Sequence, residues 1–147
     1  MSEMTYSMPP QLKVYLVVDH DAVASEELTR LLQLAPDEHW DKGAPFLMAG
    51  KERRHRFNRW SIAESVGQLA DMDDAVDRLI HRLTPIKENF CSLPKGTRVG
   101  FTVALTTPDA ILGIGLSVQH VGFLASIGAD IDLSIVVLAQ PPPAVSA

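Results

Sequence analysis

The residues best suited to chemistry gather between positions 40 and 60, where cations alternate with aromatic rings. Residues 42–59 contain six lysines or arginines and one glutamate, which gives this stretch five net positive charges. Guanidinium groups bind carboxylate and phosphate oxygens through paired hydrogen bonds, and aromatic faces stack on rings or cations. The pattern predicts an anion-binding or partner-binding surface formed by Trp40, Lys51, Arg53, Arg54, His55, Arg56, Arg59 and Trp60. The alternative is a solvated loop that offsets the acidic residues at 71–77.

The other sequence motifs do not indicate a catalytic, metal-binding or cofactor-binding site. Consecutive residues of an extended chain point to opposite faces, so the segment 19–21, with the sequence Asp-His-Asp, does not converge on one metal ion. A dinucleotide-binding fingerprint starting at Gly113 fails because position 118 is valine, and a nucleophile elbow around Ser117 fails because position 119 is glutamine. The single cysteine, Cys91, excludes an intramolecular disulfide. We therefore expect no catalytic set, no metal and no cofactor.

Composition limits the class of protein and its partners. A chain of 147 residues with 46% hydrophobic and 21% charged residues suits one compact domain. The net charge of −5 argues against binding duplex nucleic acid, although a local basic patch remains compatible with it. The N-terminal residues have no signal-peptide pattern, and the most apolar stretch, 131–139, is too short to cross a bilayer. We expect a cytoplasmic protein that does not bind membranes.

Hydrophobic periodicity predicts the elements that must position these residues. Alternation at 12–18, 57–63, 99–105, 112–116 and 131–137 is typical of strands, with a further short strand passing through Trp40. Helical spacing predicts helices over 25–34, with Ser25 as the N-cap, over about 71–93, and over 117–128. Pro85 should kink the second helix or break it in two. Between 37 and 56 the pattern is the least regular.

These elements define the expected architecture. Their order, β-α-(β)-β-α-β-β-α-β, predicts an α+β two-layer sandwich with a mainly antiparallel sheet and helices on one face. The strands at 99–105 and 112–116 should form an antiparallel hairpin. The domain should span residues 12–139, between a disordered tail at 1–11 and a proline-rich tail at 140–147.

Several of these segments together resemble a known family. They are a proline-ended helix at 31–36, a Trp-Asp-Lys-Gly-Ala-Pro loop at 40–45, a Trp-Ser-Ile strand at 60–62, the segment 79–85, and a closing helix and Gly-Ala-Asp-Ile-Asp strand over 115–133. From about residue 12 to residue 138, the chain resembles the bacterial family called domain of unknown function 4279. The resemblance implies no activity.

Two functions are compatible with the sequence. The first is a non-enzymatic interaction module that uses residues 40–60 to bind an acidic protein partner, for instance as an immunity-type protein that caps a toxin. The second is a small enzyme acting on a phosphorylated or acidic metabolite. There, arginines 53, 54, 56 or 59 would clamp the anion, and His55 or His20 would serve as acid or base. The sequence leaves the oligomeric state open.

Overall fold

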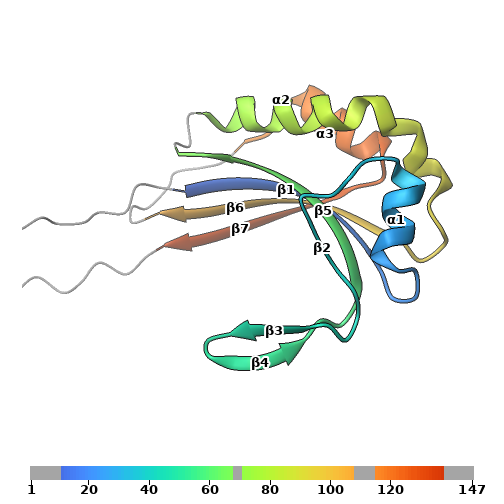
Figure 1. The fold of residues 1–147 in the computed structure, drawn as a ribbon. Coiled ribbons are helices and arrows are strands. Elements are labelled where there is room, and N and C mark those ends of the chain that lie inside the picture. Colours follow the sequence, from blue (N-terminus) through green and yellow to red (C-terminus); the bar gives the residue numbers. More distant parts are fainter. Residues whose placement is uncertain (1–10, 68–70, 108–114, 138–147) are drawn as a thin grey trace, which may run out of the picture.

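A curved five-stranded sheet carries helices on one face and a separate two-stranded hairpin beneath the other (Figure 1). The computed structural model describes residues 11–67, 71–107 and 115–137. In these residues, no helix is long and apolar enough to cross a membrane. The expected tail at 140–147 lies outside the described residues, as does the tail at 1–11 except for Gln11, which begins the first strand.

The sheet is built around its first strand. Its order is β2-β5-β1-β6-β7, with β1 bonded antiparallel to β5 on one side and to β6 on the other, and only β6 and β7 parallel. This confirms the expected α+β class with a mainly antiparallel sheet. The strand bounds are Gln11–His20 for β1, Glu38–Trp40 for β2, Asn58–Val66 for β5, Arg98–Thr107 for β6 and Asp130–Val137 for β7.

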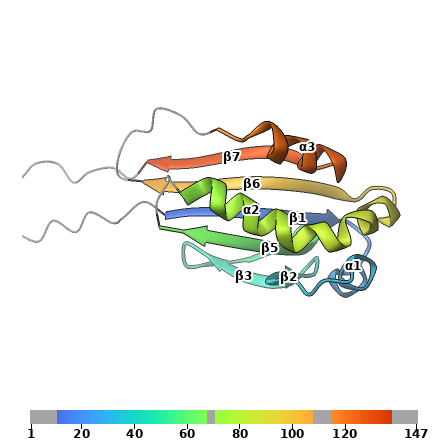
Figure 2. The same ribbon diagram turned by 90° about the horizontal axis from the view of Figure 1, so that it is seen from above.

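Alternation along the strands creates the core. Leu12, Val14, Leu16 and Val18 of β1 are almost completely buried, and so are several of the residues beside them in register on β5 and β6, namely Trp60, Ile62, Phe101, Val103 and Leu105. The covering helices are α1 (Ser25–Leu32), α2 (Met72–Leu83) and α3 (Val118–Ser126). Viewed from above, α2 runs over the middle of the sheet and α3 lies beside β7 (Figure 2). Among the described residues, no helix lies on the opposite face of the sheet.

Pro85 interrupts the second helical segment as expected. The α-helix α2 ends at Leu83, and a 3₁₀ helix, η2 (Thr84–Ser92), continues the chain. Proline lacks the amide proton that an α-helix would need there, and its ring crowds the preceding turn. The tighter 3₁₀ geometry keeps the chain compact, so Ile86 and Phe90 still reach the core.

The antiparallel hairpin expected from residues 99–105 and 112–116 is not part of the sheet that the described residues form. Residues 108–114 lie outside the described part of the chain, and residues 115–117 form no strand. β6 is bonded to β1 along one edge and to β7 along the other, so neither edge is open to a further strand. α3 serves as the connection that brings β7 back parallel to β6.

The cap of α1 also differs from the expectation. Ala24 is the N-cap, and Ser25 is already the first helical residue. The amide of Ser25 donates a hydrogen bond to Asp41 Oδ1 at 2.8 Å. A carboxylate that follows β2 therefore satisfies an open donor of the helix and lies at its positive end.

A second carboxylate joins the helical layer to the sheet edge. Asp37, which precedes β2, accepts hydrogen bonds from both terminal nitrogens of Arg82 in α2, at 2.8 and 3.0 Å. It also accepts the amide of Ala63 in β5 at 2.9 Å. The Arg82 guanidinium and this amide hold the pKa of Asp37 below its usual range.

We predict that Asp41→Ala lowers the free energy of unfolding by about 1 kcal/mol, the usual cost of losing a helix cap. Urea unfolding followed by circular dichroism measures the difference. Asp41→Asn keeps an oxygen acceptor and serves as the control, with an expected loss of at most half as much. Equal stability of Asp41→Ala and the wild type would contradict the capping role.

We predict that the stabilisation from Asp37 depends on pH. Its folded pKa lies below the unfolded value of 3.8, so its contribution is complete above that value and disappears as the pH falls through the lowered pKa. Because the side chain is 44% exposed, we expect at most about 1 kcal/mol. Unfolding of the wild type and Asp37→Asn between pH 7 and pH 2.5 should give a difference that shrinks with acidification. A constant difference would refute the assignment.

Candidate partner-binding surface

The segment that the sequence presents as irregular folds as a β-hairpin. Strands β3 (Pro45–Met48) and β4 (Lys51–Arg54) pair antiparallel through a two-residue turn at Ala49 and Gly50, whose φ angles are +50° and +75°. Positive φ at both positions is typical of the tight turns that match strand twist. Figure 1 shows this hairpin beneath the open face of the sheet. We call residues 45–57 the basic arm.

The register of the basic arm distributes its cations over both faces. Arg53 lies opposite Phe46 and Lys51 opposite Met48, while Arg54 lies opposite Pro45. Because neighbouring residues of a strand point to opposite faces, the side chains of Arg53 and Arg54 diverge. All four β4 residues are exposed.

An aromatic stack closes the base of the arm. The His55 ring lies between Trp40 and Phe46, with ring centroids 4.2 and 4.3 Å away and nearly parallel planes. Beside the stack, the His55 amide donates to the Ala44 carbonyl and the Gly43 amide donates to the His55 carbonyl. The stack therefore joins the arm to β2, the edge strand that contains Trp40.

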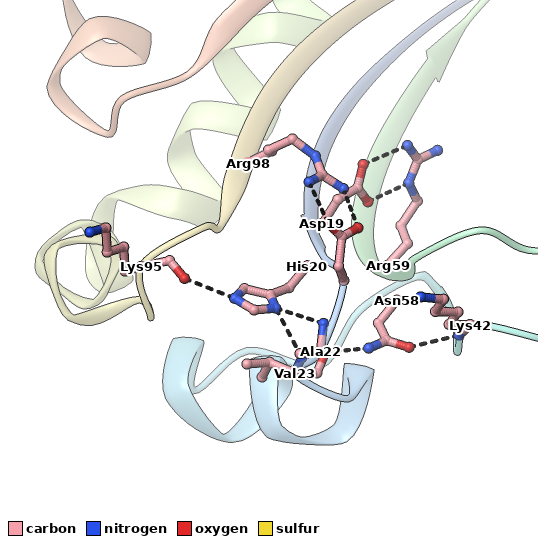
Figure 3. Close-up of polar contacts among 10 residues, drawn as sticks. Asp19, His20, Ala22, Val23, Lys42, Asn58, Arg59, Lys95 and Arg98 are labelled. Atoms are coloured by element: carbon pink, nitrogen blue, oxygen red, sulfur yellow. Dashed lines mark hydrogen bonds and ion pairs between the residues drawn. The ribbon is translucent and has the colours of Figure 1, made fainter.

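Arg59 continues this stack toward the centre of the sheet. Its guanidinium lies about 5 Å from the rings of both Trp40 and Phe57. It also donates two hydrogen bonds to Asp19, at 2.7 and 2.8 Å, in the paired geometry that Figure 3 displays. Nearby, the Arg98 guanidinium lies 5.6 Å from the centroid of the Phe57 ring and pairs with Asp21, and this ion pair lowers the pKa of Asp21. Arg59 therefore anchors the arm instead of facing solvent as a free cation.

His20 has a structural role at the end of β1. Its Nδ1 accepts the amides of Ala22 and Val23 at 2.9 and 3.0 Å, so the hydrogen-bond network assigns the ring proton to Nε2 (Figure 3). Nε2 then donates to the Lys95 carbonyl at 3.0 Å. With both nitrogens engaged, His20 holds the turn after β1 and is poorly placed as an acid or base.

The two tryptophans have different roles. Trp60 is completely buried in the core, and its Nε1 donates to the Leu34 carbonyl at 3.0 Å. Trp40 is half-buried in the stack, and its Nε1 is covered but has no hydrogen-bond partner within the described residues. Trp60 therefore stabilises the fold, whereas Trp40 belongs to the candidate surface.

The structure brings most of the candidate residues together on one arm. A shallow hollow of about 440 Å³ is lined by Phe46, Met48, Arg53, Arg54, His55, Arg56 and Phe57. Lys51 lies at the end of the arm, and Arg59 and Trp40 lie at its base. Sequence reasoning did not single out Leu47 and Met48, which are 78% and 54% exposed. Their apolar character between two turn-forming segments was the available signal.

Among the described residues, no group of three His, Cys, Asp or Glu side chains could hold a metal ion. The acidic residues at 19 and 21 are paired with different arginines, Arg59 and Arg98.

The fold and this surface define an α+β domain that presents a basic arm, anchored at its base by an aromatic stack, on one face of its sheet. The chain matches the family model described as Domain of unknown function (DUF4279) over residues 10–138 and belongs to that family. This confirms the resemblance seen in the sequence. No curated protein and no solved structure matched significantly. The description of the family names no activity, so function must be argued from the surface.

We predict that Trp40→Phe leaves the free energy of unfolding unchanged or raises it. Phenylalanine keeps a ring against His55 and removes a buried donor whose missing hydrogen bond costs about 1–3 kcal/mol. Trp40→Ala loses the stack and should destabilise the protein by about 2 kcal/mol. The fluorescence of Trp60, which remains in both variants, reports unfolding in urea. Equal losses in both variants would contradict this account of the indole nitrogen.

Proposed function

We propose that this protein is a non-enzymatic interaction module whose basic arm binds an acidic surface on a partner protein. The observation that carries the proposal is the exposure of two apolar side chains among the cations at the end of the arm: Met48 lies opposite Lys51, and Leu47 lies opposite Glu52, which stands between Lys51 and Arg53. Apolar anchors next to arginines are typical of the centres of protein interfaces, where most binding energy is concentrated.

The charge of the arm supports an acidic partner. Within the described part of the chain, Lys51, Arg53 and Arg56 form no ion pair, and Arg54 approaches Glu52 only to 3.9 Å. Residues 42–59 carry five net positive charges, while the rest of the chain has seven basic and 17 acidic residues. An acidic partner would be attracted to the arm and repelled elsewhere, which orients the encounter.

The contacts that anchor the arm support the view that its binding surface is preorganised. Arg59 and the stack of Trp40, His55 and Phe46 hold the base, so the exposed side chains project from a fixed support. Binding residues on loops above a rigid scaffold are a common arrangement, because a partner then orders few residues on binding.

The hollow on the arm supports a second candidate, a small enzyme for a phosphorylated or acidic metabolite. Arg53, Arg54 and Arg56 line it with His55. In that function the arginines would clamp the anion and the edge of the His55 ring would transfer a proton. The stacked faces of His55, which are occupied by Trp40 and Phe46, favour the partner protein instead.

We predict that the arm binds a labelled peptide of alternating glutamate and leucine, and that affinity falls steeply with salt. Arg53→Ser/Arg54→Ser and Leu47→Ser/Met48→Ser should each weaken binding at least tenfold in fluorescence anisotropy. Lys87→Ser in η2, a cation remote from the arm, should leave it unchanged.

The same variants separate the two candidates when the probe is pyrophosphate, measured by calorimetry. Binding that requires Arg53 and Arg54 but is unaffected by Leu47→Ser/Met48→Ser would support the metabolite site. Binding of neither probe, or equal binding by all variants, would refute both uses of the arm.

A further inference from the structure

The edge strand β7 exposes apolar side chains at positions that the rest of the sheet buries. Ile131, Leu133 and Ile135 are 39%, 54% and 44% exposed. Their neighbours in register on β6 are Phe101, Val103 and Leu105, which are at most 1% exposed on the same face. The difference arises because β7 ends the sheet, so its outer side has no neighbouring strand among the described residues.

The two edges of the sheet differ in how they resist pairing. β2, at one edge, has only three residues and includes Glu38. β7, at the other, has eight residues and no lysine, arginine or proline, and its charges are confined to Asp130 and Asp132 at its start. Short or charged edges discourage association, whereas a long, largely apolar edge is open to another strand.

We propose that β7 pairs antiparallel with β7 of a second copy of this chain, which joins two sheets into one continuous sheet. A two-fold axis perpendicular to the sheet at Leu133 places Ile131 opposite Ile135 and Asp132 opposite Ser134. An axis at Ser134 places Leu133 opposite Ile135 and Asp132 opposite Val136. On the face that carries Ile131, Leu133 and Ile135, both registers match apolar with apolar side chains, and both keep the aspartates apart.

The charges on β7 favour a second copy of β7 as the partner strand, and they favour antiparallel pairing of the two strands. Parallel pairing would place Asp132 next to its own copy, and like charges directly opposite destabilise a strand pair. Antiparallel pairing instead lays the acidic start of one β7 against the uncharged end of the other. The edge is thus complementary to itself, as the two-fold interfaces of most soluble oligomers require.

The size of the contact sets its expected strength. The strip consists of the three β7 side chains, and α3, which carries the exposed Val118 and Val121, lies beside this strand (Figure 2). This strip is small compared with stable interfaces, which bury about 1,200–2,000 Å². We therefore expect a dimer that dissociates at micromolar concentrations.

Sedimentation velocity of the full chain from 1 μM to 500 μM tests the proposal. The wild type should shift from the monomer to the dimer as concentration rises, and Leu133→Lys should remain a monomer throughout. Leu47→Lys, which places the same charge at an exposed apolar position on the arm, should behave as the wild type. A monomeric wild type, or a Leu133→Lys protein that still dimerises, would overturn the proposal.

Cross-linking tests the pairing directly. In a Cys91→Ser background, which removes the native thiol, a cysteine on the two-fold axis faces its own copy. Mild oxidation should therefore give a disulfide-linked dimer from Leu133→Cys or from Ser134→Cys, whichever lies on the axis. Glu26→Cys, on the exposed side of α1, should not cross-link. If neither β7 cysteine forms a dimer faster than Glu26→Cys, antiparallel pairing is wrong.

Discussion

The rest of the structure depends on the pairing of β1 with two neighbours over nearly its whole length. Nine residues of β1 lie in register with β5 and nine with β6. This pairing aligns the apolar residues of all three strands on one face, where they meet the helices. A shift by one residue would turn Leu12, Val14, Leu16 and Val18 to the open face, so burial itself fixes the register.

The same strand also supports the basic arm. Asp19, near the end of β1, binds Arg59 through two hydrogen bonds, and Arg59 lies over the Trp40 ring. Trp40 stacks on His55, which stacks on Phe46 at the start of the arm. A continuous series of contacts therefore runs from the centre of the sheet to the hairpin. Each step uses a partly buried group, so the arm is best supported at its base and most exposed at its end.

Sequence periodicity predicted the elements that bury a face, because the same burial creates both the pattern and the element. The strands around residues 12–18 and 131–137 and the break at Pro85 are examples. It missed β3 and β4 because Lys51–Arg54 has no apolar alternation, and their pairing depends on the turn and the stack. It placed the helix cap at Ser25 because Asp41, 16 residues away, reaches that site only in the folded chain.

Like the fold, the candidate site could be predicted from the sequence only in part. Local composition identified the cluster of cations, but its spacing did not distinguish the buried Trp60 from the exposed arm residues. That distinction depends on which face of β5 meets the helices. Likewise, the role of Arg59 depends on Asp19, which lies 40 residues away in sequence and beside it in the sheet.

The order of the sheet relates the two proposed surfaces to each other. The arm connects β2 to β5 at one edge, and β7 forms the opposite edge. Pairing through β7 therefore leaves both arms uncovered, and a two-fold axis perpendicular to the sheet keeps them on the same face of the joined sheet. Two arms on one face would bind a partner with repeated acidic sites more tightly than one arm, because the second contact is intramolecular. The acidic remainder of each chain would at the same time repel an acidic partner from the rest of the dimer and so direct it to the arms.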